Sequence, residues 1–121
     1  MIGIGIDAVE VDRFRQVLAR TPGVARRLFT ESERAYGNRK RDPTERLAAR
    51  FAAKEAVMKA LGVGLGAFAF HDVEVVRAPS GQPMLELRGR AEALAKQQGV
   101  TDWRLSLTHT HRVAEAVAVA L

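Results

Sequence analysis

The stretch Arg50-Phe51-Ala52-Ala53-Lys54-Glu55-Ala56-Val57-Met58-Lys59-Ala60-Leu61-Gly62 decides how the rest of the sequence is interpreted. At about 100° per residue, Leu47, Phe51, Met58 and Leu61 fall on one apolar stripe of a helix. The final glycine is a typical residue for a helix to end on. The pattern therefore predicts one long helix that packs against an apolar layer.

Three charged residues interrupt this helix. Lys54 lies inside the apolar stripe, Glu55 lies about 40° beyond its edge, and Lys59 follows Glu55 by one turn. Burial of an unpaired ammonium group costs several kcal/mol, so a lysine in the stripe is unusual. Two interpretations stay open: a functional cluster, or a snorkelling Lys54 beside an ordinary Glu55–Lys59 surface pair worth about 0.3 kcal/mol.

The start of the chain has a period of two. Residues 2–8 alternate isoleucine with glycine and reach a carboxylate at Asp7, which predicts a strand. The glycines leave one face of that strand bare, so that another backbone or a ligand can come close. Asp7 is either a terminating or capping acid or a functional one.

Local signals place the remaining elements. Thr30 to Glu33 has the pattern of a capping box and predicts the start of a short helix. Asp42 is expected to be the N-cap of the long helix, with Pro43 in its first position. The hydrophobic periods and turn residues predict a helix over 10–19, strands over 72–77 and 84–88 around a hairpin turn, a helix over 89–98, and strands over 104–110 and 113–121.

The last strand has valines on one face and alanines on the other, with Glu115 as the exception. We expect this strand to be buried on both sides. Its alanine face permits close packing, either by a helix or by another subunit. The fold class expected is α+β, a single domain over residues 1–121.

Composition narrows the class of protein. The chain has 121 residues, 47% hydrophobic and 27% charged, which is typical of a globular domain. No apolar run approaches the roughly 18 to 20 residues that a spanning helix needs, and the first residues lack the basic region of a secretory signal. Cysteine is absent, which excludes disulfides and thiolate metal sites. We expect a cytoplasmic protein without a membrane partner, in which oligomerisation can add stability.

The positive charge is concentrated early in the chain. Residues 13–41, here called the basic segment, carry nine Arg or Lys against two Glu, whereas residues 1–12 carry three acids and no base. Such a segment attracts an acidic partner, and nucleic acid is a candidate. A solvated arginine-rich face is the alternative. The seven aromatic residues occur in apolar patterns and form no stacking platform, and a nucleic-acid role leaves Asp7 and Glu55 unexplained.

Several known site types are excluded. Residues 62–66 are rich in glycine but follow a helix and lack the Gly-Lys-Ser/Thr ending, so they are not a P-loop. No clustered His-Glu spacing suggests zinc, and no nucleophile elbow is present. His109 shares a strand face with two leucines and is either a core or edge histidine or a functional one.

Five segments, in order, resemble the bacterial holo-[acyl-carrier-protein] synthases, the small 4'-phosphopantetheinyl transferases. The resemblance is carried by residues 3–14, 29–33, 50–62, 81–83 and 105–110, with the third segment the most diagnostic. Gly23 and His111 depart from the usual family pattern. The resemblance implies an antiparallel sheet packed by one long helix and several short helices.

The resemblance also implies an activity and a site. Members of this family transfer the 4'-phosphopantetheine group of coenzyme A to a serine of apo acyl carrier protein and release adenosine 3',5'-bisphosphate, for fatty acid biosynthesis. Asp7 and Glu55 match the family's Mg²⁺ ligands. Lys59 would direct a charge at the pyrophosphate, and at Gly62 the backbone would approach coenzyme A. The residues expected to hold the nucleotide end are Arg50, His109 and Thr110.

The partners follow from the same resemblance. Acyl carrier proteins are strongly acidic, so Arg13 and Arg20, two turns apart on the helix over 10–19, would dock one. Family members form a homotrimer with active sites between subunits. Phosphoryl transfer of this kind depends on positioning and on neutralising phosphate oxygens, which suits a site of two carboxylates and a lysine.

Overall fold

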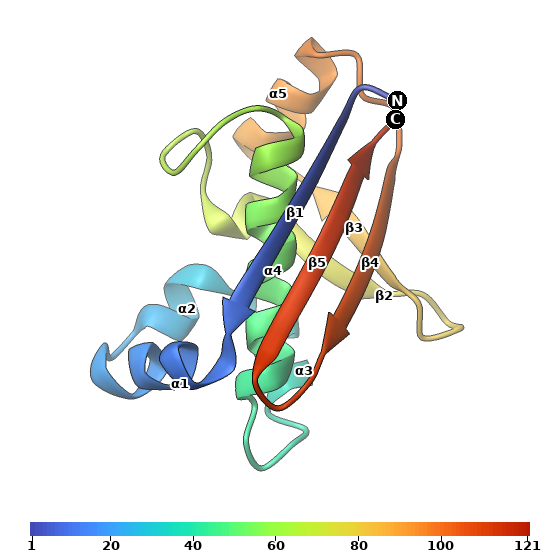
Figure 1. Cartoon of the computed structure of the whole chain (residues 1–121). Helices are drawn as coiled ribbons and strands as arrows, with labels where there is room; N and C mark the ends of the chain where they lie inside the picture. Colours follow the sequence, from blue (N-terminus) through green and yellow to red (C-terminus); the bar gives the residue numbers. More distant parts are fainter.

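The structure, a computed structural model, describes residues 1–121. Its elements in order are β1 (Gly3–Glu10), α1 (Val11–Arg20), α2 (Val24–Leu28), α3 (Glu31–Gly37), α4 (Thr44–Ala60), the 3₁₀ turn η1 (Phe70–Asp72), β2 (Val73–Arg77), β3 (Pro83–Leu87), α5 (Gly89–Gln97), β4 (Trp103–His109) and β5 (Val113–Ala120). Figure 1 shows the long helix α4 behind a sheet of three strands, with α1 and α2 near one end and α5 near the other. This architecture confirms the expected α+β fold.

The strands form two antiparallel sheets. One has the order β1-β5-β4, and the other is the β2-β3 hairpin. In the first sheet Ala116 pairs with Asp7 on one side and with Leu107 on the other. The strands β1 and β4 are therefore opposite edges of one sheet, and the two ends of the chain lie together (Figure 1).

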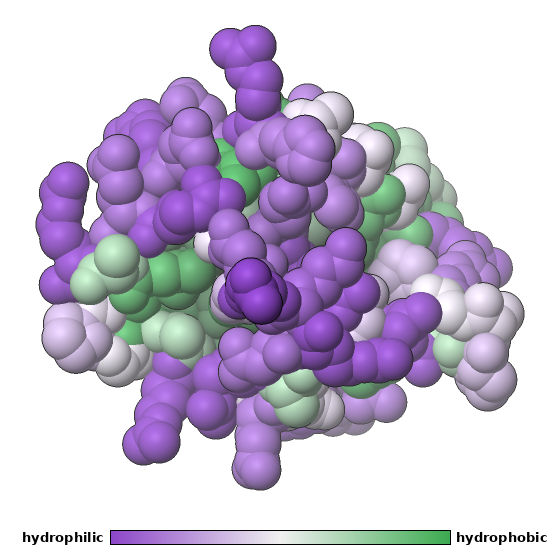
Figure 2. Space-filling model, turned by 90° about the horizontal axis from the view of Figure 1, so that it is seen from below, coloured by the Kyte–Doolittle hydropathy of each residue, from purple (hydrophilic) through white to green (hydrophobic).

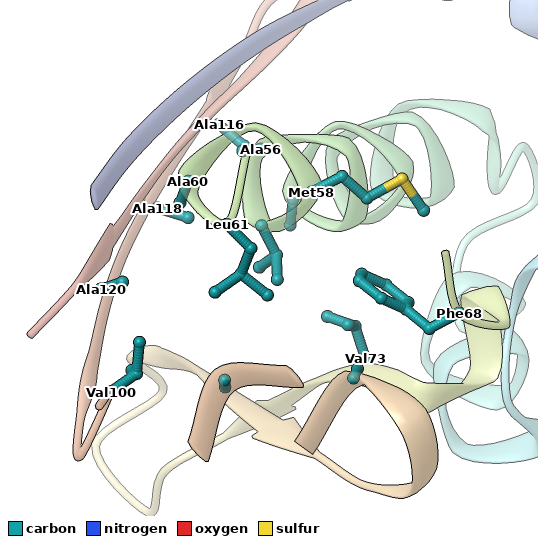
Figure 3. Close-up of a cluster of buried hydrophobic side chains, with 14 of the residues drawn as sticks. Ala56, Met58, Ala60, Leu61, Phe68, Val73, Val100, Ala116, Ala118 and Ala120 are labelled. Carbon is teal, nitrogen blue, oxygen red and sulfur yellow. The ribbon is translucent and has the colours of Figure 1, made fainter. Parts of the chain in front are cut away.

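Small residues set the distance between this sheet and α4. Ala114, Ala116, Ala118 and Ala120 of β5 are fully or almost fully buried against the helix. Figure 3 shows Ala116 and Ala118 close to Ala56 and Ala60 of α4. On β1, a Cβ atom added at Gly3 or Gly5 would collide with a carbonyl oxygen of α4. The bare glycine face predicted for β1 thus receives the backbone of the helix.

The other sides of α4 are covered as well. Met58 and Leu61 pack with Phe68 and Val73 from the region of β2, as Figure 3 shows. Toward its beginning, α4 packs against α1 and α2 through a cluster in which the rings of Phe14 and Phe51 are 5.3 Å apart. The helix is therefore buried on most of its circumference rather than on one stripe, because the sheet, the hairpin and the short helices enclose it.

The predicted start of the long helix is wrong by one residue. The helix begins at Thr44 with Pro43 as its N-cap residue, whereas the sequence predicted Asp42 as the N-cap. The Asp42 carboxylate still accepts a hydrogen bond of 3.0 Å from the Thr44 N–H, so it satisfies one free donor from outside the helix. The capping box is confirmed, since Thr30 and Glu33 exchange both of its hydrogen bonds.

The last strand is buried on one side only. Its alanine face is covered by α4, but Val113, Val117 and Val119 on the other face are half-buried and Glu115 is exposed. The reason is that no element of this chain covers the outer side of the three-stranded sheet. As for membrane crossing, none of the helices combines the length and the apolar character that a span requires.

Candidate active site

Asp7, Glu55 and Lys59 meet where β1 passes over α4. The Lys59 ammonium lies 3.2 Å from Asp7 Oδ1 and donates a hydrogen bond of 2.9 Å to the carbonyl oxygen of Ile6. Lys59 therefore pairs with Asp7 across the contact between strand and helix, not with Glu55 along the helix. The interpretation of Glu55 and Lys59 as an ordinary surface pair is wrong.

The glycines of β1 explain how Asp7 reaches this position. Gly3 contacts Ala60 and Gly5 contacts Ala56, so two residues along the strand correspond to one turn along the helix. Asp7 is the next residue on the same face of β1, and it is the first there with a side chain. Its carboxylate consequently extends toward the charged side of α4, on which Glu55 and Lys59 are one turn apart.

A cavity of about 670 Å³ opens beside these acids, between β1 and α1. Asp7 and Glu55 are both in its wall, together with the exposed side chains of Arg13 and Arg20. The apolar part of the wall is formed by Val9, Phe14, Val17 and Phe51. The structure thus brings the two predicted docking arginines and the two predicted metal ligands to one hollow.

The two carboxylates influence each other electrostatically. Partial burial raises the pKa of Glu55, the negative charge of Asp7 raises it further, and Lys59 opposes the shift. Two acids held this close favour an arrangement in which a cation lies between them. No third His, Asp or Glu joins them in a metal-binding group. Such a donor set fits Mg²⁺, which is commonly held by one or two carboxylates with substrate phosphates and waters completing its shell.

Lys54 is fully buried and does not snorkel. Its ammonium donates hydrogen bonds to Glu33 Oε1 at 2.8 Å, to the carbonyl oxygen of Phe70 at 3.0 Å and to that of Val73. Burial lowers the pKa of Lys54, and the charge and hydrogen bond of Glu33 oppose that shift. The lysine in the apolar stripe is therefore a paired core residue.

A second, cationic pocket of about 260 Å³ lies near β4, at the opposite edge of the sheet. Arg50 and His109, both predicted to hold a nucleotide, line this pocket. The Arg50 side chain is buried against the ring of Tyr36, 4.1 Å from its centroid, and its Nε has no hydrogen-bond partner. Burial lowers the pKa of Arg50. An unpartnered buried donor in a cationic pocket favours an anionic ligand.

Sequence reasoning missed three residues of this second pocket. The Arg46 guanidinium lies 4.2 Å from the centroid of the Tyr36 ring, and that of Arg77 in β2 lies 4.9 Å from it. One signal was available, because Arg46 precedes Arg50 by one helical turn and so shares its face. Nothing in the local sequence indicates that Tyr36 or Arg77 approaches these two, since α3 and β2 meet α4 only through the tertiary fold.

Three predicted site residues line neither pocket: Lys59, Gly62 and Thr110. The Thr110 hydroxyl accepts hydrogen bonds from the N–H groups of Arg112 and Val113, within the turn between β4 and β5. Gly62 lies just beyond the end of α4 with a φ of 71°, three residues after Lys59. His109, in contrast, does line the second pocket; its side chain is exposed, and its Nδ1 donates a hydrogen bond to Glu45 at 2.9 Å.

Comparison with known proteins gives one consistent result. A family described as the 4'-phosphopantetheinyl transferase superfamily matches residues 3–120. A holo-[acyl-carrier-protein] synthase of Frankia alni is 51% identical over 120 residues, which is 99% of this chain and 97% of that protein.

Solved structures agree with this result. The crystal structure of holo-[acyl-carrier-protein] synthase from Neisseria meningitidis superposes with a TM-score of 0.89 at 29% identity, covering 100% of this chain and 98% of that one. The Helicobacter pylori holo-[acyl-carrier-protein] synthase in complex with coenzyme A superposes at 0.85 with 28% identity, covering 98% of this chain and 99% of that one. Since the family match extends over almost every residue, this chain belongs to the 4'-phosphopantetheinyl transferase superfamily.

Proposed function

We propose that this chain is a holo-[acyl-carrier-protein] synthase, which transfers 4'-phosphopantetheine from coenzyme A to a serine of apo acyl carrier protein. The observation that carries the proposal is the convergence of Asp7, Glu55 and Lys59 in a chain so similar to such enzymes along its whole length. A coenzyme A complex of a relative with the same fold supports the donor substrate.

In the reaction the serine Oγ forms a bond to the phosphorus that carries the pantetheine arm. The bond from that phosphorus to the bridging oxygen of the pyrophosphate breaks, and adenosine 3',5'-bisphosphate leaves. The serine proton passes to a base that we leave unassigned. Negative charge on the phosphate oxygens has to be neutralised for this step, and the residues present provide for it.

Asp7 and Glu55 would hold Mg²⁺, which when bound neutralises phosphate charge. Lys59 contributes a cation to the same place, because its ammonium already lies against Asp7. That ammonium is half-exposed, so it can turn from the carboxylate toward a pyrophosphate. The chain's own residues thus orient and neutralise the reacting phosphate, and Gly62 leaves room at the end of α4 for the pantetheine side of the donor.

The nucleotide end of coenzyme A is proposed to occupy the second, cationic pocket. Arg46, Arg50 and Arg77 gather there around Tyr36, and His109 lies at the rim. A phosphate monoester is a dianion that arginines recognise well through charge-assisted hydrogen bonds. Thr110 would act indirectly, by fixing the turn that follows His109.

The two pockets lie at opposite edges of one sheet and share no residue, which supports an active site assembled from two subunits. On the outer face of the sheet, β1 and β5 also present isoleucine and valine side chains, with Ile4 and Ile6 58% and 61% exposed. An exposed apolar face of this kind marks an interface. We propose that three copies pack through it as a homotrimer, with each site between neighbours.

The basic segment is proposed as the docking surface for the acidic carrier protein. Figure 2 views the molecule from the end at which α1, α2 and α3 lie, and most of that surface is hydrophilic. Arg13 and Arg20 are exposed there, in the wall of the cavity that contains Asp7 and Glu55. A docked carrier would therefore present its serine to the metal site. We place the enzyme, one domain of residues 1–121, in cytoplasmic fatty acid biosynthesis.

A mass measurement tests the proposed function. The protein is incubated with coenzyme A, Mg²⁺ and an apo acyl carrier protein, and the carrier should gain one phosphopantetheine per molecule. The control carrier has its acceptor serine replaced by alanine. No mass gain on the wild-type carrier, with a known synthase active in parallel, would contradict the proposal.

A further inference from the structure

Glu33 and Lys54 form a buried pair. Lys54 directly precedes the proposed metal ligand Glu55 in the chain, but neither member of the pair lines the two pockets. Both side chains are essentially inaccessible, and their charged atoms are 2.8 Å apart. We propose that the Glu33–Lys54 pair is a positioning device that fixes the rotation of α4, so that Glu55 faces Asp7. The proposal rests on the proposed function, because it assigns the pair a purpose in holding the metal ligands.

The first support is that every polar atom of the pair has a partner in a different element. Lys54 has three donor hydrogens, and they meet Glu33 of α3, the Phe70 carbonyl of η1 and the Val73 carbonyl of β2. Glu33 Oε2 accepts from the N–H of Val75 at 2.9 Å. Three elements around α4 are therefore linked to one point of its surface.

The second support is the smoothness of the side of α4 that faces the three-stranded sheet. The side of the helix that meets β1 and β5 consists of alanines, packed against glycine and alanine. Such a surface sets a close distance but has few ridges to interlock, so shape alone defines the helix rotation weakly. Hydrogen bonds are directional, and a buried set of them defines rotation where small side chains do not.

The third support is that the reaction rate is sensitive to a small displacement of Glu55. Glu55 follows Lys54 at once in the chain, so its direction is fixed relative to Lys54 by the helix itself. At a helix radius of about 5–6 Å, a rotation of about 10° moves a surface atom by about 1 Å. Misplacement by 1 Å can lower a rate by about two orders of magnitude. A small rotation of α4 is therefore enough to separate Glu55 from Asp7.

The energetics favour a positioning role over a stabilising one. A buried ion pair loses hydration that its mutual attraction only partly returns, and apolar replacement of such pairs is often neutral. A pair kept for stability alone has no advantage at this buried place, where the Lys54 ammonium lies 5.8 Å from the centroid of the Phe29 ring. Directional control of α4 is an advantage that apolar side chains do not supply.

The test replaces the charged pair by an apolar one of similar volume, which cannot form the directional hydrogen bonds, Glu33→Met with Lys54→Met. Three quantities are measured on the whole protein: the melting temperature, the Kd for Mn²⁺ by electron paramagnetic resonance with coenzyme A saturating, and kcat and carrier KM. We expect a folded protein whose Kd for Mn²⁺ rises at least tenfold and whose kcat falls at least tenfold, with carrier KM changed less than twofold. The matched control is Glu92→Met with Lys96→Met, an exposed pair on α5.

A merely structural role gives a different result. It lowers the folded fraction, so kcat falls in proportion while the Kd of the folded protein for Mn²⁺ stays within twofold of the wild-type value, and this outcome overturns the positioning proposal. Should the double variant not fold, Glu33→Asp, which keeps both charges but shortens one arm, is judged by the same criteria. If wild type binds no Mn²⁺, the proposed metal site fails as well. If wild type binds and the variant binds equally, only the positioning role fails.

Discussion

Lys59 Nζ lies 3.2 Å from Asp7 Oδ1, and this contact joins the longest helix to an edge strand of the sheet. The two residues are 52 positions apart in the chain. Glu55, one turn before Lys59, is left without the lysine as its partner and close to a second negative charge. A cation that binds between the two carboxylates stabilises the ionised form of Glu55, and the first predictions follow from this.

Asp7→Ala and Glu55→Ala should each lower kcat by at least about 100-fold while the protein stays folded, because each removes one of the two carboxylates proposed to hold the metal that neutralises phosphate charge. Excess Mg²⁺ should restore activity only weakly. Steady-state kinetics and circular dichroism check both points. Near-normal turnover in either variant would remove that residue from the metal site.

Glu55→Gln should stabilise the unliganded protein at neutral pH. The folded pKa of Glu55 is raised, so the folded state holds its proton more tightly than the unfolded chain does, and the ionised side chain destabilises the fold above that pKa. The melting temperature of the variant should exceed that of wild type at pH 8. The difference should vanish as the pH falls through the raised pKa and below the ordinary value of glutamate. A lower melting temperature for the variant at pH 8 would contradict the electrostatic interpretation.

Arg13→Glu with Arg20→Glu should raise the apparent carrier KM by one to two orders of magnitude, or roughly 1.4 to 2.8 kcal/mol, because both charges then repel an acidic carrier. Coenzyme A binding should hardly change. Higher salt should weaken wild type far more than the variant. Titrations with carrier and with coenzyme A at two salt concentrations measure this. Equal losses for both ligands would show damage to the fold instead.

Arg50→Met should weaken coenzyme A binding by about tenfold or more, since the buried guanidinium has a free donor in the cationic pocket and charged hydrogen bonds are worth about 1.5–3 kcal/mol. Carrier binding should be retained. Isothermal titration calorimetry compares this variant with Arg90→Met, a matched change at an exposed arginine outside both pockets. Equal affinities of the two variants for coenzyme A would place the nucleotide elsewhere.

Gly5→Ala should lower the free energy of unfolding by about 3 kcal/mol or more, at the upper end of overpacking effects, because the new Cβ meets a backbone oxygen that cannot move aside. The matched change Gly64→Ala has open space around it and should be neutral or slightly stabilising. Urea denaturation of both variants distinguishes these cases. Similar stabilities would mean that α4 can withdraw from β1.

Much of this fold could be predicted from local patterns. The alternation before Asp7, the capping box at Thr30 and the valine–alanine strand each produced the expected element. These features depend on neighbours within a few residues, which is the range that a periodic pattern can report. The start of α4 was misplaced by one residue because both Asp42 and Pro43 are good residues for a helix start.

Partners that are distant in the chain could not be predicted in the same way. Lys54 was recognised as unusual, but its partner Glu33 is 21 positions away and had already been assigned to a local cap. Tyr36 gathers arginines from α4 and β2, and no spacing rule connects those elements. The outer valines of β5 were expected to be buried but are half-buried, because no element of this chain covers the outer side of the sheet and a pattern within one strand does not report what packs above it.

The capping box at Thr30 has a consequence for how the protein folds. Glu33 closes the first turn of α3 and at the same time binds Lys54 and the N–H of Val75. A helix of seven residues does not persist alone in water. The carboxylate that caps α3 must therefore find its distant partners before the helix is secure, so secondary and tertiary structure form together here. Because α3 also carries Tyr36, a chain that has folded only in part lacks the second, cationic pocket, which is the proposed site of the nucleotide.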